Sequence, residues 1–343
     1  MSLIPSIYRS TDPGAPVLSG QAGSLLALLH AVLVTGYGSG ANLKPGAGWT
    51  RPFSSSTVHV YRNSSISGSG AYLRVRDDAS ADMLNSPCLA QAIGYSDMSD
   101  IDTGENRTPS LSMQARGSLI AKAPPGNTAP REWIAIATEI GFYLFTDWSI
   151  YNRGRAPYYF GDLISSVGGD AYPFAMFGSA DLTNYSGTWS DYVMSVFWST
   201  ELSSELPAPG GDYSTRGQAG GFTMRSYSSG AAAPGRIATV GFGTAGTSRY
   251  SYGTDVFPSG KDKAHGGYNF TRALVKEAPF TIRGHLPGLL VPLHVRPYAD
   301  GEHVTYVDGM GVGDWVAINY NTAEPDIAAR DGQVLFHMDA PWK

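Results

Sequence analysis

The stretch from Gly241 to Gly246 is one of the few parts of this sequence whose spacing suggests chemistry. Its glycines follow the G-x-G-x-x-G pattern of turns that bind the pyrophosphate of a dinucleotide, and a predicted strand at 236–242 leads into them. Such a turn must open a helix, because the helix N-terminus receives the pyrophosphate. Residues 247–258 are aromatic and interrupted by glycine, with no helical period. We therefore interpret these glycines as turn formers rather than as a cofactor site.

A second candidate is the block Tyr159-Phe-Gly-Asp-Leu163, which is similar to the strand-to-turn block that carries the nucleophile in one class of lipases and esterases. Leu163 stands where that block has its serine, so no hydroxyl is present to attack a carbonyl. The sequence contains neither a G-x-S-x-G elbow nor an H-E-x-x-H motif. The pair Gly161-Asp162 is therefore interpreted as a turn, and no catalytic residue is predicted.

Metal ligands are the third possibility. Four histidines gather near the C-terminus, but none stands at the i, i+2 spacing of a strand or the i, i+4 spacing of a helix. The acidic stretch from Asp97 to Glu105 offers oxygen ligands beside a glycine, yet it departs from the spacing of a calcium loop, and a solvated acidic turn is the alternative. The single cysteine, Cys88, excludes a cysteine-based zinc site and is interpreted as a buried small hydrophobe. No metal-binding residue and no cofactor is predicted. The four histidines are His285, His294, His303 and His337.

The composition disfavours several classes of protein. Lysine and arginine total 24 against 29 acidic residues, so the formal net charge is 24 − 29 = −5, with no run of basic residues. Nucleic-acid binding needs a concentrated basic surface, so no nucleic-acid partner is predicted. No stretch approaches about 18 consecutive apolar residues, so no membrane span is predicted. Aromatic residues make up 12% of the chain and charged residues only 15%. This combination suits large protein–protein interfaces or a sugar-binding face, although β cores also use aromatic side chains.

The elements that would position these residues are strands, with one helix. Residues 21–34 are rich in strong helix formers and are followed by Gly36, which predicts a helix that is apolar on several sides. Short β-branched and aromatic runs elsewhere predict strands, and those at 132–137 and 141–145 have the spacing of a hairpin. The predicted fold class is mainly β, with β-sandwich or barrel-like domains. The predicted divisions are an N-terminal arm and helix at 1–50, a central β domain at 51–200, a Gly/Pro-rich linker at 201–235 and a C-terminal β domain at 236–343.

The composition of residues 1–20 predicts an extended arm. They hold several proline and glycine breakers, yet also apolar side chains such as Leu3, Ile7 and Leu18 that need burial. We expect arm and helix to dock on neighbouring copies of the chain, most simply in a closed ring. The alternative is that the arm packs along its own β domain.

The block Ile7-Tyr-Arg-Ser-Thr-Asp-Pro-Gly-Ala-Pro16 is the most specific of a series spread along the chain. The other blocks are Gly36–Gly38, Lys44–Trp49, Tyr72–Arg76, Asp97–Gly104, Phe142–Phe145, Gly161–Ser165, Ile282–Gly288 and Pro341–Trp342. In these blocks the sequence resembles a family of structural proteins from the virions of tailed bacteriophages. The resemblance implies no enzymatic activity, and it transfers no functional residues.

The resemblance implies a virion structural subunit made in the host bacterial cytoplasm, and it leaves open whether the subunit belongs to the tail, the baseplate or the head. We expect the tail or baseplate. Its partners would be other virion proteins and copies of itself. Two alternatives stay open: a glycan-binding or glycan-cleaving β protein of the phage tail that engages the host surface, and a capsid decoration protein. Glycan cleavage would need two carboxylates about 5 to 9.5 Å apart. The central region offers Asp162, Asp170, Asp181 and Asp191.

Overall fold

The computed structural model of the chain confirms the predicted fold class. It describes residues 3–78, 89–111, 117–123, 127–147, 155–177, 223–238, 270–277, 281–292, 298–307, 310–320 and 333–342. Of the described residues 50% are in strands and 7% are helical, so this part of the chain is mainly β with one short helical region near the N-terminus.

The helical region lies where the sequence predicts it. Helix α1 (Ser24–His30) continues as a π-helical turn, η1 (Ala31–Thr35), and a 3-10 turn, η2 (Gly40–Asn42), follows. The leucines of α1 at positions 25, 26, 28 and 29 are all buried, as the apolar pattern predicts. The helical region ends at Gly36, where φ is 77° and an added Cβ would lie 2.2 Å from the Lys44 carbonyl oxygen. None of the helices in the described segments is long and apolar enough to span a membrane.

A five-stranded antiparallel sheet lies beside α1. Its strands, in spatial order, are β2 (Thr50–Ser54), β3 (Val58–Arg62), β4 (Tyr72–Arg76), β5 (Leu89–Tyr95) and β8 (Ser118–Ala121). A small hairpin of β6 (Asp97–Met98) and β7 (Gly104–Glu105) extends from β5. The Tyr61 hydroxyl on β3 donates a hydrogen bond to the Leu26 carbonyl oxygen, 3.0 Å away, which ties the helix to this sheet.

The second sheet has 13 strands, and every pairing in it is antiparallel. It begins with β1 (Ser6–Arg9), β9 (Trp133–Ala137), β10 (Gly141–Asp147), β11 (Arg155–Asp162) and β13 (Phe174–Phe177). It continues through β14 (Thr223–Arg225), β15 (Ala232–Ala238), β16 (Phe270–Glu277) and β17 (Thr281–Pro292). The last strands are β20 (Gln333–His337), β19 (Gly311–Asn319) and β18 (His303–Val307), and β12 (Ile164–Ser165) pairs with β17. The predicted hairpin of 132–137 and 141–145 is confirmed as β9 and β10.

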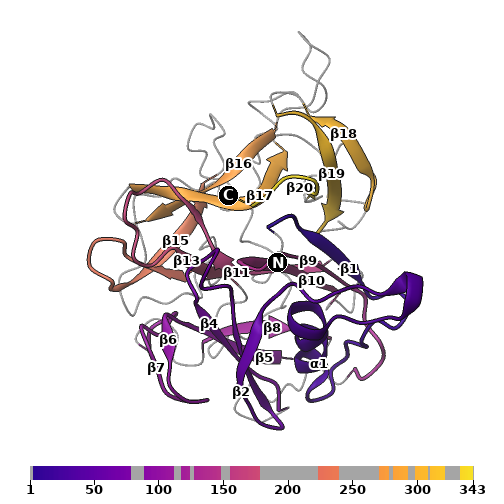
Figure 1. The fold of residues 1–343 in the computed structure, drawn as a ribbon, viewed down its shortest axis with the longest axis horizontal. Coiled ribbons are helices and arrows are strands. Elements are labelled where there is room, and N and C mark those ends of the chain that lie inside the picture. Colours follow the sequence, from indigo (N-terminus) through magenta and orange to yellow (C-terminus); the bar gives the residue numbers. More distant parts are fainter. Residues whose placement is uncertain are drawn as a thin grey trace.

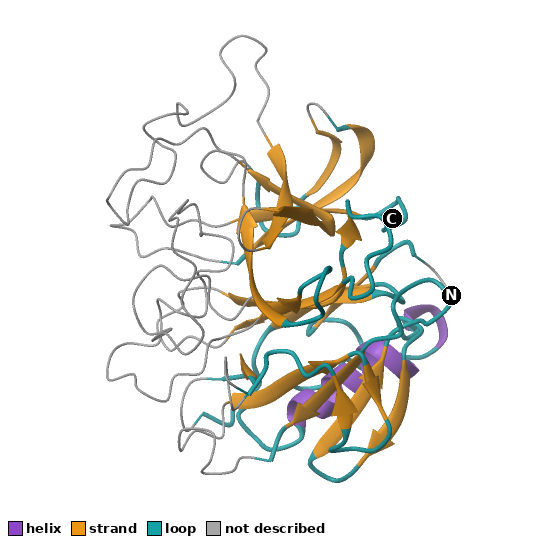
Figure 2. Cartoon of the chain, turned by 90° about the vertical axis from the view of Figure 1, so that its left-hand side faces the viewer, coloured by secondary structure: helices purple, strands orange, loops and turns teal. Residues whose placement is uncertain are grey.

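The strands form three tiers (Figures 1 and 2). Strands β9, β10, β11 and β13 cross the middle, the five-stranded sheet and α1 lie on one side, and β16 to β20 lie on the other. Alternate residues of the middle strands therefore enter different cores. Trp133, Phe142 and Leu144 join the cluster around α1, whereas Tyr143 and Phe145 join the cluster that includes Trp342.

The structure corrects two expectations about the organisation of the chain. The N-terminal segment is not free for docking: β1 pairs with β9, and Tyr8 and Leu18 are 1% and 0% exposed. The alternative, an arm packed along its own β domain, is what the structure has. In the predicted linker, the described part at 223–235 holds β14 and the start of β15, which bridge β13 to β16 within the sheet.

This packing makes the arm part of the folded core, and two adjacent residues test it. Leu18 is fully buried, whereas its neighbour Val17 is 60% exposed. We expect Leu18→Ala to lower the free energy of unfolding by about 2–5 kcal/mol. The control Val17→Ala should change it by less than about 0.5 kcal/mol. Urea titration of both variants provides the measurement, and equal effects of the two substitutions would contradict the burial of the arm.

Candidate functional site

The N-terminal block of the resemblance is built around the Asp12 carboxylate. Its Oδ2 accepts hydrogen bonds from the Arg9 backbone N–H (2.7 Å), the Tyr37 hydroxyl (2.6 Å) and the Lys44 ammonium (2.7 Å). Lys44 also donates to the Ile7 carbonyl oxygen, 2.9 Å away. We call Arg9, Asp12, Tyr37 and Lys44 the Asp12 cluster. Three separate blocks of the sequence thus meet at one carboxylate.

The Asp12 cluster is half-buried and electrostatically matched. The side chains of Asp12 and Lys44 are 15% and 30% exposed. Burial alone would raise the pKa of Asp12, but the hydrogen bonds from Lys44, Tyr37 and Arg9 outweigh it and hold the pKa below its ordinary value of 3.8. Burial and the Asp12 charge raise the pKa of the Tyr37 hydroxyl, so it stays protonated as a donor.

The remaining resemblance blocks also contact one another. Arg74 on β4 forms an ion pair of 2.5 Å with Asp102, in the loop between β6 and β7. Gly288 on β17 faces the Trp342 ring so closely that an added Cβ would lie 2.1 Å from the indole nitrogen. The Trp342 ring in turn packs edge-on against Tyr143 of β10, with centroids 5.4 Å apart. These side chains therefore connect the chain's separate sheets and strands.

Asp162 lies at the end of strand β11 rather than in the turn that the sequence predicts for Gly161-Asp162. Its carboxylate accepts hydrogen bonds from the Ser69 backbone N–H (2.6 Å), the Ser69 hydroxyl (2.5 Å) and the Asn63 amide (3.0 Å). Burial raises the pKa of Asp162 against these hydrogen bonds. The carboxylate joins the loop between β3 and β4 to the large sheet, and Asp162 is buried, at 5% exposure.

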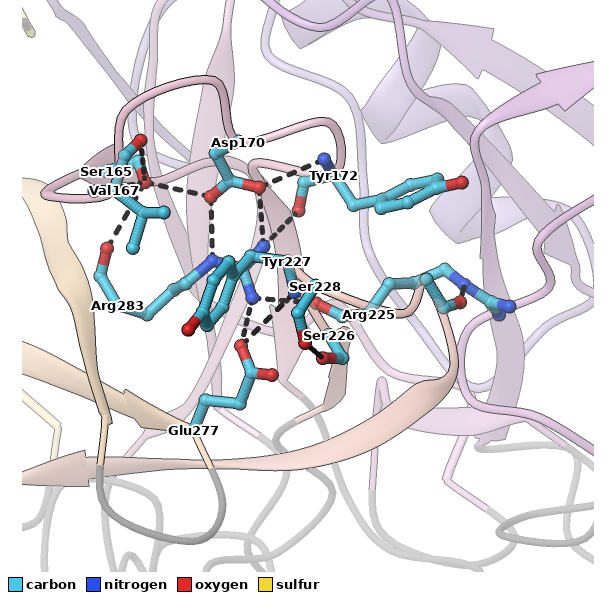
Figure 3. A network of polar contacts seen from close by, with 11 residues as sticks. Ser165, Val167, Asp170, Tyr172, Arg225, Ser226, Tyr227, Ser228, Glu277 and Arg283 are labelled. Carbon is cyan, nitrogen blue, oxygen red and sulfur yellow. Dashed lines mark hydrogen bonds and ion pairs between the residues drawn. The ribbon is translucent and has the colours of Figure 1, made fainter.

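A second buried network is centred on Arg283 of β17 (Figure 3). Its Nε and Nη2 donate to the two oxygens of Asp170, at 2.7 and 2.6 Å, and Nη1 donates to Glu277. The remaining N–H groups reach the carbonyl oxygens of Arg225 (2.8 Å) and Tyr172 (3.0 Å). All five guanidinium donors are therefore used. Arg283 is fully buried, and Asp170 and Glu277 are 3% and 4% exposed.

The described candidates for glycan cleavage are thus engaged inside the protein. Asp162 is bound by Ser69 and Asn63, and Asp170 by Arg283, the Ser165 hydroxyl (2.8 Å) and the Tyr172 backbone N–H. The other two candidates, Asp181 and Asp191, lie outside the described residues.

The candidate metal ligands lie apart. His285 is on β17, His303 pairs with Asp314 at 2.7 Å, and His337 stacks on Trp315 with centroids 4.0 Å apart. In the described parts of the chain, no group of three histidine, cysteine or acidic side chains could hold a metal ion. In the acidic stretch Asp97–Glu105, Asp97 of β6 and Glu105 of β7 stand opposite each other in the backbone register of the hairpin. His294, Cys88 and the glycines 241–246 lie outside the described residues.

Sequence reasoning missed the two cationic side chains that are fully buried among the described residues. Arg283 is one, and Lys122 is the other: its ammonium lies 2.6 Å from Asp77, and both side chains are 0% exposed. The only signal in the sequence is a single charged residue beside an apolar run, as in Leu119-Ile-Ala-Lys122-Ala. Such a residue predicts a buried ion pair without identifying its partner.

Comparison with known proteins adds no relative. No protein-family model matches the chain, and no curated protein is significantly similar to it. The geometry therefore defines the class: a mainly β protein whose described buried charges serve as internal connections between sheets and loops.

The Asp12 cluster predicts a dependence of stability on pH. Because the pKa of Asp12 is lowered in the folded protein, the cluster stabilises the fold above the ordinary pKa of 3.8 and loses this contribution as the pH falls through the folded value. We expect Asp12→Asn to cost about 2 kcal/mol near neutral pH, because hydrogen bonds to a charged group are lost. The difference between variant and wild type should shrink below pH ~4. Thermal unfolding at several pH values measures it, and a constant difference would contradict this role.

The Arg283 network predicts a large effect of one substitution. Arg283→Met leaves the carboxylates of Asp170 and Glu277 buried without their partner, and breaking such a pair costs about 3–5 kcal/mol. The control Arg272→Met removes an exposed arginine from neighbouring strand β16 and should change stability by less than about 0.5 kcal/mol. Denaturant unfolding compares the two, and a loss below about 1 kcal/mol for Arg283→Met would show that the network does not hold the strands together.

Proposed function

We propose that this chain is a structural subunit of a tailed-phage virion, located in the tail or baseplate. It assembles with other virion proteins and with copies of itself. The observation that carries the proposal is that the blocks which resemble the virion proteins contact one another in space. Asp12, Tyr37 and Lys44 come from three such blocks and share one carboxylate, and Gly288 meets Trp342. Residues that hold separate parts of the fold together in this way suit a protein with a structural role.

The internal use of Asp162 and Asp170, the two described candidates, favours this role over glycan cleavage. A glycosidase needs two carboxyl groups that reach the substrate. Asp170 is instead held by Nε and Nη2 of the buried Arg283 side chain, and Asp162 by Ser69 and Asn63. Groups held in this way stiffen the fold and are closed to a sugar.

One sheet edge supplies a surface for assembly. Strand β18 is the last in the large sheet, and within the described residues no strand pairs with its outer side. On the same hairpin, Tyr306 faces Val312 across the β18–β19 pair, and these side chains are 54% and 86% exposed. Open edges with apolar side chains are places where a further chain adds a strand. We assign this edge to contact with a neighbouring subunit.

The proposal is tested on purified phage particles that encode this chain. Mass spectrometry should find the chain at a fixed ratio to the known tail proteins, and a cryo-EM map of the tail should contain its three-tiered fold. Absence of the chain from washed particles would contradict a virion role. Depolymerisation of host polysaccharide by the purified chain, abolished by one substitution, would contradict the structural assignment in favour of cleavage.

A matched pair of variants tests the assembly edge in the same particles. Val312→Lys places a charge on β19 opposite Tyr306 of the edge strand β18, whereas Ile66→Lys changes an equally exposed aliphatic residue in the loop between β3 and β4. We expect Val312→Lys to reduce incorporation by about tenfold, the effect of ~1.4 kcal/mol at one contact, and Ile66→Lys to leave it unchanged. Equal incorporation of the two variants would exclude this edge from the assembly contact.

A further inference from the structure

Two histidine rings are neighbours between helix α1 and the five-stranded sheet, away from the networks described above, and the charge of Arg51 acts on both. His30 is the last residue of α1, His59 lies on β3 and Arg51 lies on β2. The two imidazole rings are 6.1 Å apart between centroids and stand edge to face. The pairs Thr50↔Arg62 and Phe53↔Val60 leave Arg51 and Pro52 opposite the single residue Tyr61, so a bulge brings Arg51 beside the tyrosine that neighbours His59.

The hydrogen bonds of Tyr61 fix the proton on His59. The Tyr61 hydroxyl donates its only hydrogen to the Leu26 carbonyl oxygen, 3.0 Å away. The contact of 3.0 Å between this hydroxyl and Nδ1 of His59 must therefore have the imidazole as donor. Neutral His59 then carries its proton on Nδ1, and its Nε2 has a free lone pair. Protonation adds an N–H donor at Nε2 and leaves the bond to Tyr61 intact.

These basic groups have no acidic partner among the described residues. Neither histidine side chain nor Arg51 forms an ion pair there, and Nδ1 of His30 is buried without a hydrogen-bond partner. Burial and the charge of Asp77 raise the pKa of the Tyr61 hydroxyl. The Asp77 carboxylate is already bound by Lys122 at 2.6 Å and by the Leu25 backbone N–H at 3.0 Å. A buried nitrogen without a partner, beside an unpaired guanidinium, is costly unless a ligand completes the site.

We propose that Arg51, His30 and His59 form a binding site for a small oxyanion of the sulfate, phosphate or carboxylate type, which binds together with protons taken up by the imidazoles. Arg51 supplies a permanent charge and a fork of N–H donors that matches two oxygens of the anion. Protonation gives each imidazole a second N–H donor, which on His59 is at Nε2. The side chains are half-buried, so a small ion can reach them from solvent.

The electrostatics of the three side chains agree with this coupling. Burial, and next the charge of Arg51, lower the pKa of His59 to about 4, and the same two causes lower the pKa of His30. Both imidazoles are therefore neutral near pH 7 without an anion. Because their pKa values are lowered on folding, they stabilise the fold above the ordinary value of 6.5, and this contribution is lost as the pH falls. An anion favours the protonated forms and offsets that loss.

A metal ion is the competing ligand for two neutral imidazoles. The guanidinium of Arg51 acts on both rings and repels a cation placed between them. This charge favours an anion, and the two ligands are distinguished by experiment.

The test is a pH titration of the histidine ring protons by NMR on the full chain, with sodium sulfate, sodium acetate or sodium chloride at matched ionic strength. Sulfate and acetate separate a phosphate-like ligand from a carboxylate. His30→Gln and His59→Gln assign the resonances among the chain's seven histidines. We expect one of the two oxyanions to raise the pKa of His59 from about 4 by at least one unit, while chloride does not. Each unit corresponds to about tenfold tighter binding to the protonated form.

Arg51→Gln and Arg272→Gln form the matched pair, since both remove one positive charge and Arg272 lies on β16, outside this site. In Arg51→Gln the anion-dependent rise in the pKa of His59 should disappear, whereas Arg272→Gln should keep it. Comparison of the two variants also removes the general stabilising effect of sulfate on proteins. An equal rise in both variants, or no rise with either oxyanion, would overturn the proposal. Zn²⁺ binding that requires His30 and survives Arg51→Gln would overturn it in favour of a metal site.

Discussion

Strands β9, β10 and β11 are apolar on both faces, and this constraint determines the arrangement of the rest of the chain. All five residues of β9 are buried, as are the first six of β10. A sheet with two apolar faces must be covered twice. Helix α1 and the five-stranded sheet cover one face, and the strands from β16 onward cover the other. The N-terminal strand β1 then pairs with the outer side of β9, so the backbone edge of β9 is not open.

Covering one sheet from both sides requires contacts that hold each layer in place, and buried charged groups provide them. Asp162 ties the loop between β3 and β4 to the large sheet, Lys122 and Asp77 tie β8 and β4 to the start of α1, and Arg283 joins β17 to Asp170. Apolar contacts tolerate small shifts between layers. A guanidinium with all five donors engaged does not, because every displacement breaks a hydrogen bond in a medium of low dielectric constant. These groups therefore specify the position of each layer more than they add to stability.

The local elements could be predicted from the sequence, but their partners could not. The leucines of α1, the alternation of β3 and β4 and the hairpin spacing of β9 and β10 are local patterns, and the structure confirms them. The pairing of β1 with β9 joins residues more than a hundred positions apart, where no local pattern reaches. The continuous apolar run of β9, Trp-Ile-Ala-Ile-Ala, predicts that the strand is buried on both faces. Such a run does not identify the elements that cover it. The Asp12 cluster shows the same limit: its three blocks were noted separately, and only the fold shows that they share a carboxylate. Arg51, His30 and His59 are likewise brought together by a bulge and a helix end.

Tyr143 shows what this layering means for the newly made chain. Its ring is fully buried, and its hydroxyl donates to the carbonyl oxygen of Pro287, 144 residues further along the sequence. At a synthesis rate of about 5–20 residues per second, the covering strands leave the ribosome roughly 7–30 s after the strand that they cover. During that interval one face of the middle tier is an uncovered apolar surface with open backbone edges. Until the covering strands are made, this face of the chain is exposed to aggregation, a risk that the finished fold does not reveal.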